Sequence, residues 1–525
     1  MSGLISQLKT YKMYLLIALI GIIASIFVLF FSYSTFQNSG FAVGKCRLLA
    51  FTLVVLIVFV ELYYHFSIVV KSKLEYLFLI TTICLGLIYS IFFPPITVAD
   101  ENAHFMIPYY YSQKILLMPG ESEDHNMLFR DCDQVFFDNK KINGSYQYLS
   151  ELYHNYPDFY VGKQELFESS QQVRGTSGNI MIYLPVVTGM VIAKLLGLGI
   201  LPLLILAKLM NFATFTLLTF LGIRKIPFGK GFLLLTATLP IANLFATSLS
   251  YDPINNAIAF AFIGYALFFL YDKGEKTKKD MVLLTIFTVS LAFTKGGLYM
   301  ILSGILLIGF RSAKGVLKKE NFWIFRTWLL ELTAYVLALL SNKYLFTTSN
   351  VLSVDHFERL EKAGRYTISD CITQPFTTLK IMFLTVLRYV DDWLFEIIGA
   401  KLSWVSVPLP KLLLVLIAIA LFLALFCDQP QKQAVTWRQK LWVLMIAGMI
   451  LAGVELIMLL AEPLDGIYIH GVQGRYFHAL LPMLFICFVG KIRIQKESYY
   501  RWLLMSCNVL YAVASLIAAV TILRN

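Results

Sequence analysis

The sequence predicts an all-α polytopic membrane protein with about 13–14 transmembrane helices. Hydrophobic residues make up 58% of the 525 residues and charged residues only 14%, whereas soluble globular domains are roughly 25% charged. Apolar runs of about 20 residues recur along the chain, and each is long enough to cross a hydrocarbon core of roughly 30 Å. They include 179–197, 231–249 and 281–310, and the last is long enough to be two short helices broken at Gly296-Gly297. One polar stretch, 94–176, is long enough to form a sizeable loop carrying short helices.

The apolar runs divide the chain into five predicted parts. No small-residue cleavage site follows the first run, 13–33, so we expect a retained helix rather than a signal peptide. The parts are N-terminal helices at 1–93, a loop with catalytic carboxylates at 94–176, central helices at 177–347, a second external or amphipathic region at 348–406, and C-terminal helices at 407–525.

Charge predicts how the chain is oriented. The 44 lysines and arginines exceed the 32 aspartates and glutamates, for a net charge of +12. The excess lies in short loops, so we interpret it as an orientation signal rather than as a nucleic-acid surface. The basic loops 272–280 and 311–319 are then cytoplasmic. The sequence predicts a multi-pass protein of the cell membrane whose 94–176 loop faces outside.

One part of this topology does not balance. Residue 175 is predicted to lie outside, and two predicted crossings between it and the basic loop at Arg224 leave that loop outside as well. The charge rule predicts instead that a basic loop is cytoplasmic. Either the stretch 179–223 contains re-entrant pieces, or the Arg224 loop is an exception to the charge rule. The sequence leaves both alternatives open.

The most informative motif follows the third apolar run. Pro94 and Pro95 cannot continue a helix, so the span should end there and place the next carboxylates at the membrane boundary. If a helix begins near Thr97, Asp100 and His104 share one face and the imidazole can orient the carboxylate, while Glu101 points elsewhere. The alternative is that both acids simply favour the first turn of an interfacial helix.

Three further features concern the loops. The stretch 105–117 predicts an amphipathic helix lying on the membrane surface. Asn143-Gly144 is a turn signal that could join two short strands. None of the seven cysteines forms a C-x-x-C motif, and it stays open whether Cys132 and Cys371 pair or are unrelated free thiols.

Polar clusters also interrupt the apolar runs, and ionisable groups at membrane depth are functional candidates because they are costly there. Asp252, with Asn255 and Asn256 after it, either caps a helix that Pro253 starts or belongs to a site. Lys295, before Gly296-Gly297, either extends to the surface or neutralises a phosphate that the glycines allow to approach.

Two other clusters carry an arginine. Arg388 precedes Asp391-Asp392, which is also the pattern of a solvated ion-pair cluster. Arg475, in Gly471–His478, either anchors the chain at the membrane boundary or binds phosphate. No P-loop, Gly-rich nucleotide loop or metal-spaced His/Cys set is present.

Pro94-Pro95 followed by Asp100-Glu101-x-x-His104-Phe105 resembles an uncharacterised family of bacterial polytopic proteins placed near the GT-C glycosyltransferases. Gly474–Phe477 before a late helix resembles a step of the same family, and Tyr183–Pro185 resembles an aromatic-Pro element of many GT-C enzymes. The chain departs from these patterns in the four residues between Pro95 and Asp100 and in lacking His-Pro before Tyr183.

The resemblance implies a GT-C-like fold and an inverting transfer of sugar from a polyprenyl-phosphate donor to a cell-surface glycan or glycolipid acceptor. Asp100 would be the general base, Glu101 a less favoured one, and His104 its orienting partner. Arg475 and then Lys295 are the candidates for binding phosphate. The predicted substrate-binding residues are Arg475, Lys295, Tyr476, Tyr299, Asp252, Asn256, Tyr183 and Gln473.

The predicted partners are the lipid-linked donor, the acceptor and membrane lipids, without nucleic acid. No cofactor is required by the sequence, no metal ligands are predicted, and a need for a divalent metal stays open. The main alternative is a lipid or polysaccharide transporter (flippase), which should show an internal repeat that we do not find. A non-catalytic assembly subunit is a third possibility.

Overall fold

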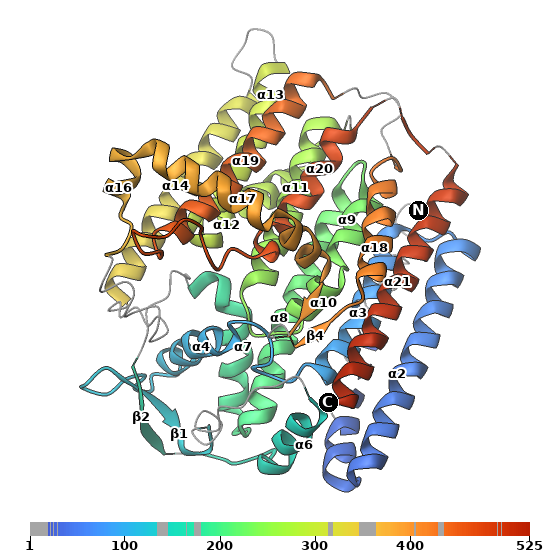
Figure 1. Ribbon diagram of the computed structural model, residues 1–525, viewed down its shortest axis with the longest axis vertical. Helices are drawn as coiled ribbons and strands as arrows, with labels where there is room; N and C mark the ends of the chain where they lie inside the picture. Colours follow the sequence, from blue (N-terminus) through green and yellow to red (C-terminus); the bar gives the residue numbers. More distant parts are fainter. Residues whose placement is uncertain are drawn as a thin grey trace.

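The computed structural model describes residues 19–133 without 21, 22, 25 and 29; 145–272 without 164 and 173–179; 274–312; 319–345; and 364–525 without 404–405, 429–434, 491 and 495. The first half of the predicted span 13–33 lies largely outside these residues, as does the Asn143-Gly144 turn. Figure 1 shows an almost entirely helical molecule, which confirms the predicted all-α polytopic class.

The helices follow one another with short connections. They are α2 (Phe41–Tyr64), η1 (His65–Val69), α3 (Leu74–Phe92), α4 (Glu101–Ile115), α6 (Tyr146–Asn155), α7 (Ile180–Leu195), α8 (Ile200–Lys225), α9 (Lys230–Ala237), α10 (Pro240–Ala246), α11 (Asp252–Tyr271), α12 (Lys278–Leu291), η2 (Thr294–Leu306), α13 (Leu307–Ser312), α14 (Lys319–Leu345), α16 (Ile368–Thr373), α17 (Pro375–Ile398), α18 (Lys411–Ala424), α19 (Trp437–Leu459), η3 (Gly474–Leu480), α20 (Leu481–Phe488) and α21 (Glu497–Arg524).

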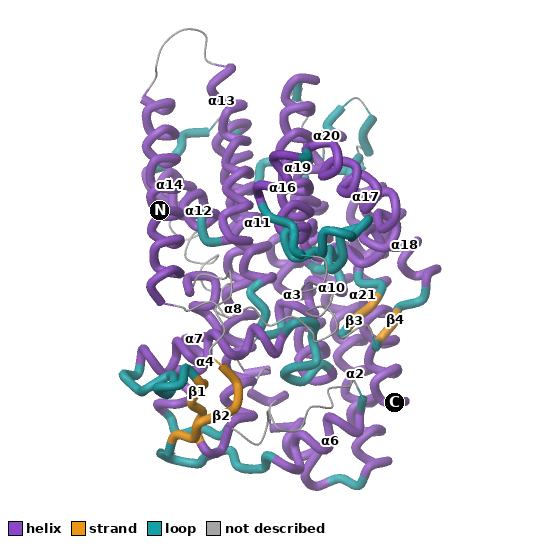
Figure 2. The backbone as a smooth tube through the Cα atoms, turned by 60° about the vertical axis from the view of Figure 1, so that its left-hand side comes forward, coloured by secondary structure: helices purple, strands orange, loops and turns teal. Residues whose placement is uncertain are grey.

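Strands are few in the described part of the chain. β1 (Asn126–Arg130) pairs antiparallel with β2 (Leu166–Gln172), and β3 (Lys401–Leu402) pairs with β4 (Val407–Pro408). Figure 2 shows β1 and β2 at the lower end of the helical bundle, beside α4 and α7. β1 and β2 therefore belong to the predicted 94–176 loop rather than to the helical bundle.

Seven helices of the described residues are long and apolar enough to cross a membrane. They lie at Phe41–Val69, Leu74–Phe92, Ile200–Lys225, Asp252–Tyr271, Phe322–Leu340, Trp437–Leu459 and Glu497–Arg524. Four shorter apolar helices lie at Ile180–Leu195, Thr294–Gly309, Lys411–Ala424 and Gly474–Phe488. The described residues thus hold fewer full-length spans than the predicted 13–14, because several apolar runs form short or broken helices.

Two of the apolar runs break into shorter helices. The predicted span 231–249 forms α9 and α10, which Pro240 separates, and every residue of the two helices but Lys230 is buried. The predicted break at Gly296-Gly297 lies near the start of η2, just after α12 ends, and Lys295, Gly296 and Gly297 all adopt left-handed angles. Apolar composition alone does not distinguish such buried pieces from lipid-facing spans.

The contacts at the end of α7 concern the topology of residues 179–223, which the sequence leaves open. The backbone N–H groups of Val161 and Gly162 donate to Gly197 O at 2.8 and 3.1 Å, so the α7–α8 turn lies against the predicted loop. α8 then crosses once to Lys225, which pairs with Asp280 at the start of α12 at 2.6 Å. The far end of α7 thus lies beside the loop, as the re-entrant alternative requires, and α8 alone leads from there to Arg224.

α4 corrects the prediction of a surface helix at 105–117. It begins at Glu101 and packs against α7, with Phe105 and Tyr109 fully buried. Ser112 and Gln113, two polar residues of this stretch, are also buried, and there Ser112 Oγ donates to Tyr109 O and Gln113 Nε2 to Leu128 O. The polar side chains are hydrogen-bonded inside the protein, so the helix belongs to its interior.

α11 is the central helix of the bundle. It packs closely on α8, where a Cβ on Gly264 would lie 2.5 Å from Gly222 O, so only glycine allows this approach. Of the 18 most apolar consecutive residues of α11, 78% are buried inside the protein. The first residue of this well-packed helix is Asp252, which is therefore rigidly placed.

Candidate functional site

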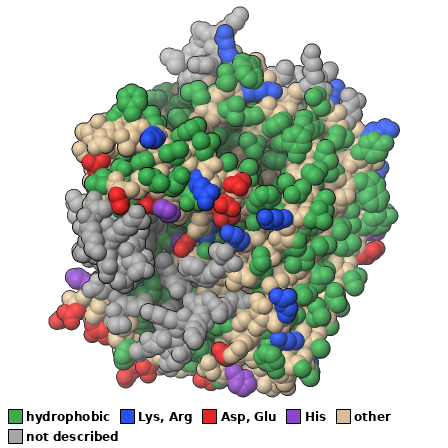
Figure 3. All heavy atoms as spheres, in the orientation of Figure 1, with side chains coloured by type: hydrophobic (Ala, Val, Ile, Leu, Met, Phe, Trp, Pro, Cys, Tyr) green, Lys and Arg blue, Asp and Glu red, His purple; other side chains and the backbone are tan. Residues whose placement is uncertain are grey.

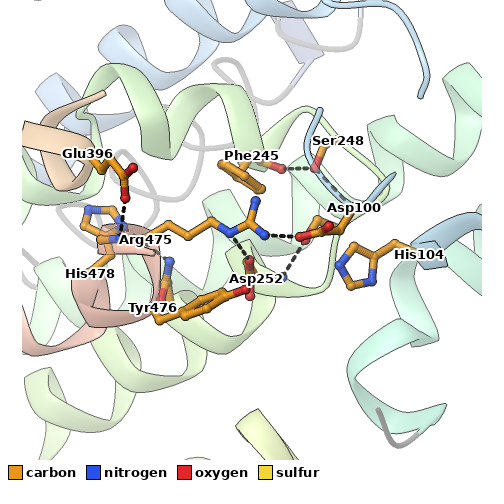
Figure 4. Close-up of polar contacts among 12 residues, drawn as sticks. Asp100, His104, Phe245, Ser248, Asp252, Glu396, Arg475, Tyr476 and His478 are labelled. Carbon is orange, nitrogen blue, oxygen red and sulfur yellow. Dashed lines mark hydrogen bonds and ion pairs between the residues drawn. The ribbon is translucent and has the colours of Figure 1, made fainter. Parts of the chain in front are cut away.

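Four segments that are distant in sequence meet on one side of α11. They contribute Asp100 from the turn before α4, Asp252 from α11, Lys295 from η2 and Arg475 from η3. In Figure 4 the Arg475 guanidinium points between Asp100 and Asp252, with His104 beside Asp100. The structure thus brings together the motif that follows the third apolar run and three of the polar clusters noted in the sequence.

Asp100 lies at the end of a tightly held turn. Asp100 itself has φ +63°, a strained left-handed conformation for a residue other than glycine. The turn is fixed because Lys208 Nζ donates to Phe93 O at 2.6 Å and Ser403 Oγ to Thr97 O at 2.6 Å. The prediction that a helix begins near Thr97 is wrong: α4 begins at Glu101, because the turn after the prolines occupies the residues before it.

Glu101 is buried and faces away from Asp100. Its carboxylate accepts the backbone N–H of Val98 at 3.0 Å and of Leu249 at 2.8 Å, and burial raises its pKa. The two oxygens therefore join the turn before α4 to the segment before α11. Both oxygens of the Glu101 carboxylate thus hold backbone next to Asp100.

Replacing Glu101 by glutamine is expected to lower the thermal midpoint of the detergent-purified protein. The amide keeps one acceptor and turns an N–H₂ group toward a backbone donor, and an unsatisfied buried donor costs about 1–3 kcal/mol. The matched control is Glu151→Gln on α6, where the carboxylate is exposed and accepts only from Gln147. Equal midpoints for the two variants would contradict the role given to Glu101.

His104 is a buried, neutral imidazole. Its Nδ1 lies 2.8 Å from Tyr183 OH, and its ring meets that of Tyr251 edge-on at 4.6 Å between centroids. Burial lowers its pKa to about 4, so the ring carries no charge at neutral pH. Its backbone N–H donates to the backbone oxygen of Asp100 at 3.1 Å, and the contact of Nδ1 with Tyr183 sets the orientation of its ring.

Asp252 joins the two cations of the site. It accepts from Lys295 Nζ at 2.7 Å and lies 3.3 Å from Arg475 Nε. Arg475 Nη2 also bonds Asp100. Asp252 and Arg475 are almost fully buried, with side chains 6% and 8% exposed, whereas the Asp100 side chain is 44% exposed. Asp100 is therefore the accessible member of the cluster.

Aromatic rings surround the cations. Lys295 Nζ lies 4.0 Å from the centroid of the Tyr476 ring and 5.2 Å from that of Tyr251, while the guanidinium of Arg475 lies 4.8 Å from the Phe245 ring. Such contacts stabilise desolvated cations. Lys295 is thus held inside the protein and is not a lysine that extends to the membrane surface.

The other predicted binding residues lie around this cluster. Tyr299 OH donates to Tyr476 O at 2.9 Å, and Gln473 O accepts the backbone N–H of Tyr476 at 3.0 Å. Asn256 lies deeper, with Nδ2 at 3.2 Å from His478 Nδ1. These groups hold the backbone around Arg475 and Tyr476 rather than facing Asp100.

Two groups noted in the sequence lie apart from the site. Asp391 and Asp392 are exposed on α17, and Cys132 and Cys371 are both free thiols. Within the described ranges, no three His, Cys, Asp or Glu side chains are arranged to hold a metal ion.

Sequence reasoning missed several residues of the site. Tyr251 and Phe245 form its aromatic walls, and Lys208 fixes the turn that carries Asp100. Lys208 interrupts an apolar run as Lys295 does, so the same criterion would have found it. No sequence signal marked Phe245, because one phenylalanine in an apolar run is unexceptional.

The comparison with known proteins covers most of the chain. Residues 83–484 match the family described as Predicted membrane protein (DUF2142), and this range includes every residue of the cluster around Arg475. No curated protein and no solved structure matches the chain significantly. Since the family match spans well over half of the sequence, the chain belongs to the DUF2142 family of predicted membrane proteins.

Proposed function

We propose that this protein is an inverting membrane glycosyltransferase of the GT-C type, which moves a sugar from a polyprenyl-phosphate donor to a cell-surface glycan or glycolipid acceptor. The observation that carries the proposal is the pairing of an accessible carboxylate, Asp100, with a buried arginine, Arg475, beside a second buried cation, Lys295. A base and a phosphate partner are the two groups that such a transfer requires.

The ion pairs of the site distinguish the roles of the two carboxylates. Asp252 is buried and contacts both cations, so it balances their charge and holds them in place. Asp100 contacts only Arg475 among these cations and is much more exposed. An incoming donor phosphate would therefore replace Asp100 on Arg475 and leave the Asp100 carboxylate free.

The freed carboxylate then acts as general base. An acceptor hydroxyl oxygen forms a bond to the anomeric carbon of the donor while the bond from that carbon to the phosphate oxygen breaks. The hydroxyl proton passes to Asp100, and the electron pair of the broken bond remains on the phosphate. Arg475 and Lys295 stabilise the charge that develops there, and attack opposite the leaving group inverts the anomeric carbon.

We place the site at the external face of the cell membrane. Lys225 lies at the end of α8 that is remote from the α7–α8 turn, and it pairs there with Asp280. Positive residues favour the cytoplasmic side, so the Asp100 side would face outside. This orientation gives the site access to polyprenyl-linked sugars and to surface glycans.

A lipid transporter is the second candidate function. The observation that favours it is the left-handed break at Lys295–Gly297 within an apolar helix, because transporters often bind substrate where helices are discontinuous. A transporter would move a lipid-linked sugar between leaflets without making a glycosidic bond.

The test uses purified protein in liposomes that contain short-chain polyprenyl-phosphate sugars and a panel of bacterial glycan acceptors. We expect the mass of one acceptor to rise by one sugar and free polyprenyl phosphate to be released in equal amount. Asp391→Asn, which changes an exposed carboxylate of α17, should leave the reaction unaltered. Movement of the donor between leaflets without a new glycosidic bond would replace the transferase by the transporter.

A further inference from the structure

α17 exposes a continuous apolar stripe although it is packed against the protein. The side chains of Phe376, Leu379, Phe383, Leu387, Val390 and Leu394 are 40–87% exposed. They recur at intervals of three and four residues, so they share one face of the helix. A face of this kind needs an apolar environment.

A second exposed face of α17 is polar. Thr377, Lys380, Arg388, Asp391 and Asp392 are exposed and lie beside the apolar stripe on the helix surface. With these charges the 24-residue helix is not among the candidate membrane spans, despite its length. The two faces together fit a helix with hydrocarbon on one side and water on the other.

The third face of α17 holds the segment that leads to Arg475. Thr385 Oγ1 accepts the backbone N–H of Ile469 at 2.9 Å, Trp393 Nε1 donates to Val472 O at 3.0 Å, and Glu396 accepts the backbone N–H of Gly474 at 2.8 Å. A Cβ at Gly474 would lie 2.2 Å from Trp393 O, so the backbones touch. The position of α17 therefore determines the position of Arg475.

α17 lies across the bundle rather than along it. Figures 1 and 2 show it crossing α19. The crossing is at the C-terminal end of α19, where Ile381 packs with Leu459 and Ile469. The space-filling view of this side shows apolar and charged side chains mixed over the surface where α16 and α17 run (Figure 3). A helix at the end of a span and across it lies near the plane of the membrane surface.

We infer that α17 lies parallel to the membrane surface, with its apolar stripe in the lipid leaflet on the side of the membrane where Asp100 lies. In this position α17 holds Arg475 level with the lipid phosphates. Its partner is the bilayer itself. On the polar face, Lys380 and Arg388 suit the phosphates of phospholipid headgroups, and Asp391 and Asp392 suit water. The second part rests on the proposed function, because it explains how a lipid-linked phosphate would reach Arg475.

The placement of α17 is tested with the full-length protein in phosphatidylglycerol–phosphatidylethanolamine liposomes. A fluorescent amino acid is introduced singly at Phe383 or Leu387 on the apolar face, and at Thr377 or Asp391 on the polar face. Quenching by lipids brominated in the acyl chain is compared with quenching by aqueous iodide.

We expect brominated lipid to quench positions 383 and 387 several-fold more strongly than 377 and 391, and iodide to show the reverse order. Equal iodide quenching at all four positions would place the helix in water. Absence of quenching by either agent at 383 and 387 would show that protein, such as a second copy of the chain, covers the stripe. Either result overturns the inference. The measurement needs no turnover, so it is independent of the proposed transferase activity.

The link to Arg475 is tested by Phe383→Glu with Leu387→Glu, with Thr377→Glu as matched control. If α17 sets the depth of Arg475, the double variant should raise the KM for a bilayer-anchored donor at least tenfold and leave that for a short, detergent-soluble donor unchanged. An equal change with both donors, or none with either, would reject this link.

Discussion

Replacing Asp100 by asparagine is expected to abolish sugar transfer without unfolding the protein. The amide keeps the volume of the side chain and removes the base, whose contribution to such a reaction is typically about 10²–10⁴-fold. The side chain is 44% exposed, so the fold does not depend on burying its charge. The measurement is the initial rate of transfer in liposomes, with thermal midpoint as the check on folding.

The same substitution separates the proposed mechanism from simpler roles of Asp100. In the proposed mechanism Asp100 competes with the donor phosphate for Arg475, so the Asp100→Asn variant should bind donor as tightly as the wild type or more tightly. A residue that held the donor directly would lose affinity on substitution. Transfer within about threefold of the wild-type rate would exclude Asp100 as the base, because a base contributes far more.

Arg475→Lys has the second-largest expected effect. In the structure Arg475 reaches two carboxylates with different nitrogens, Nη2 toward Asp100 and Nε toward Asp252. A lysine ammonium is a point charge without this planar fork, and losing one of the two parallel hydrogen bonds that a guanidinium can make to a donor phosphate should cost about 1–3 kcal/mol. That cost corresponds to roughly a 5- to 150-fold lower transfer rate.

The control for Arg475→Lys is Arg388→Lys on the exposed face of α17, which should leave transfer unchanged. The transfer rate and the affinity for donor lipid are measured for both variants. If Arg475→Lys keeps wild-type values of both, Arg475 is a membrane-boundary anchor, and Lys295 remains as the phosphate partner among the cations of the site.

Local chemistry explains which structural predictions succeeded. The third span ends at Phe92, directly before the proline pair, because proline cannot continue the helix. The run 281–310 breaks at Gly296-Gly297, where glycine permits positive φ angles. In both places the conformation depends on residues within a few positions along the chain.

Predictions failed where the outcome depended on distant partners. The periodic polarity of 105–117 indicated a helix, but the sequence could not show that α7 covers it. The apolar run 179–197 predicted a span, whereas hydrogen bonds from Val161 and Gly162 place its far end beside the loop. Hydrophobicity measures the need for burial and does not say whether lipid or protein meets it.

The sequence by itself therefore determined the class of the protein, the ends of several helices and the polar residues that interrupt the apolar runs. Only the tertiary structure decided that Arg475 pairs with Asp100, which lies 375 positions away, and that Glu101 serves the backbone instead of the site. The physical reason is that a charge at membrane depth must be paired, but its sequence neighbours do not reveal the partner. Packing of α11, η2, η3 and the turn before α4 supplies that partner.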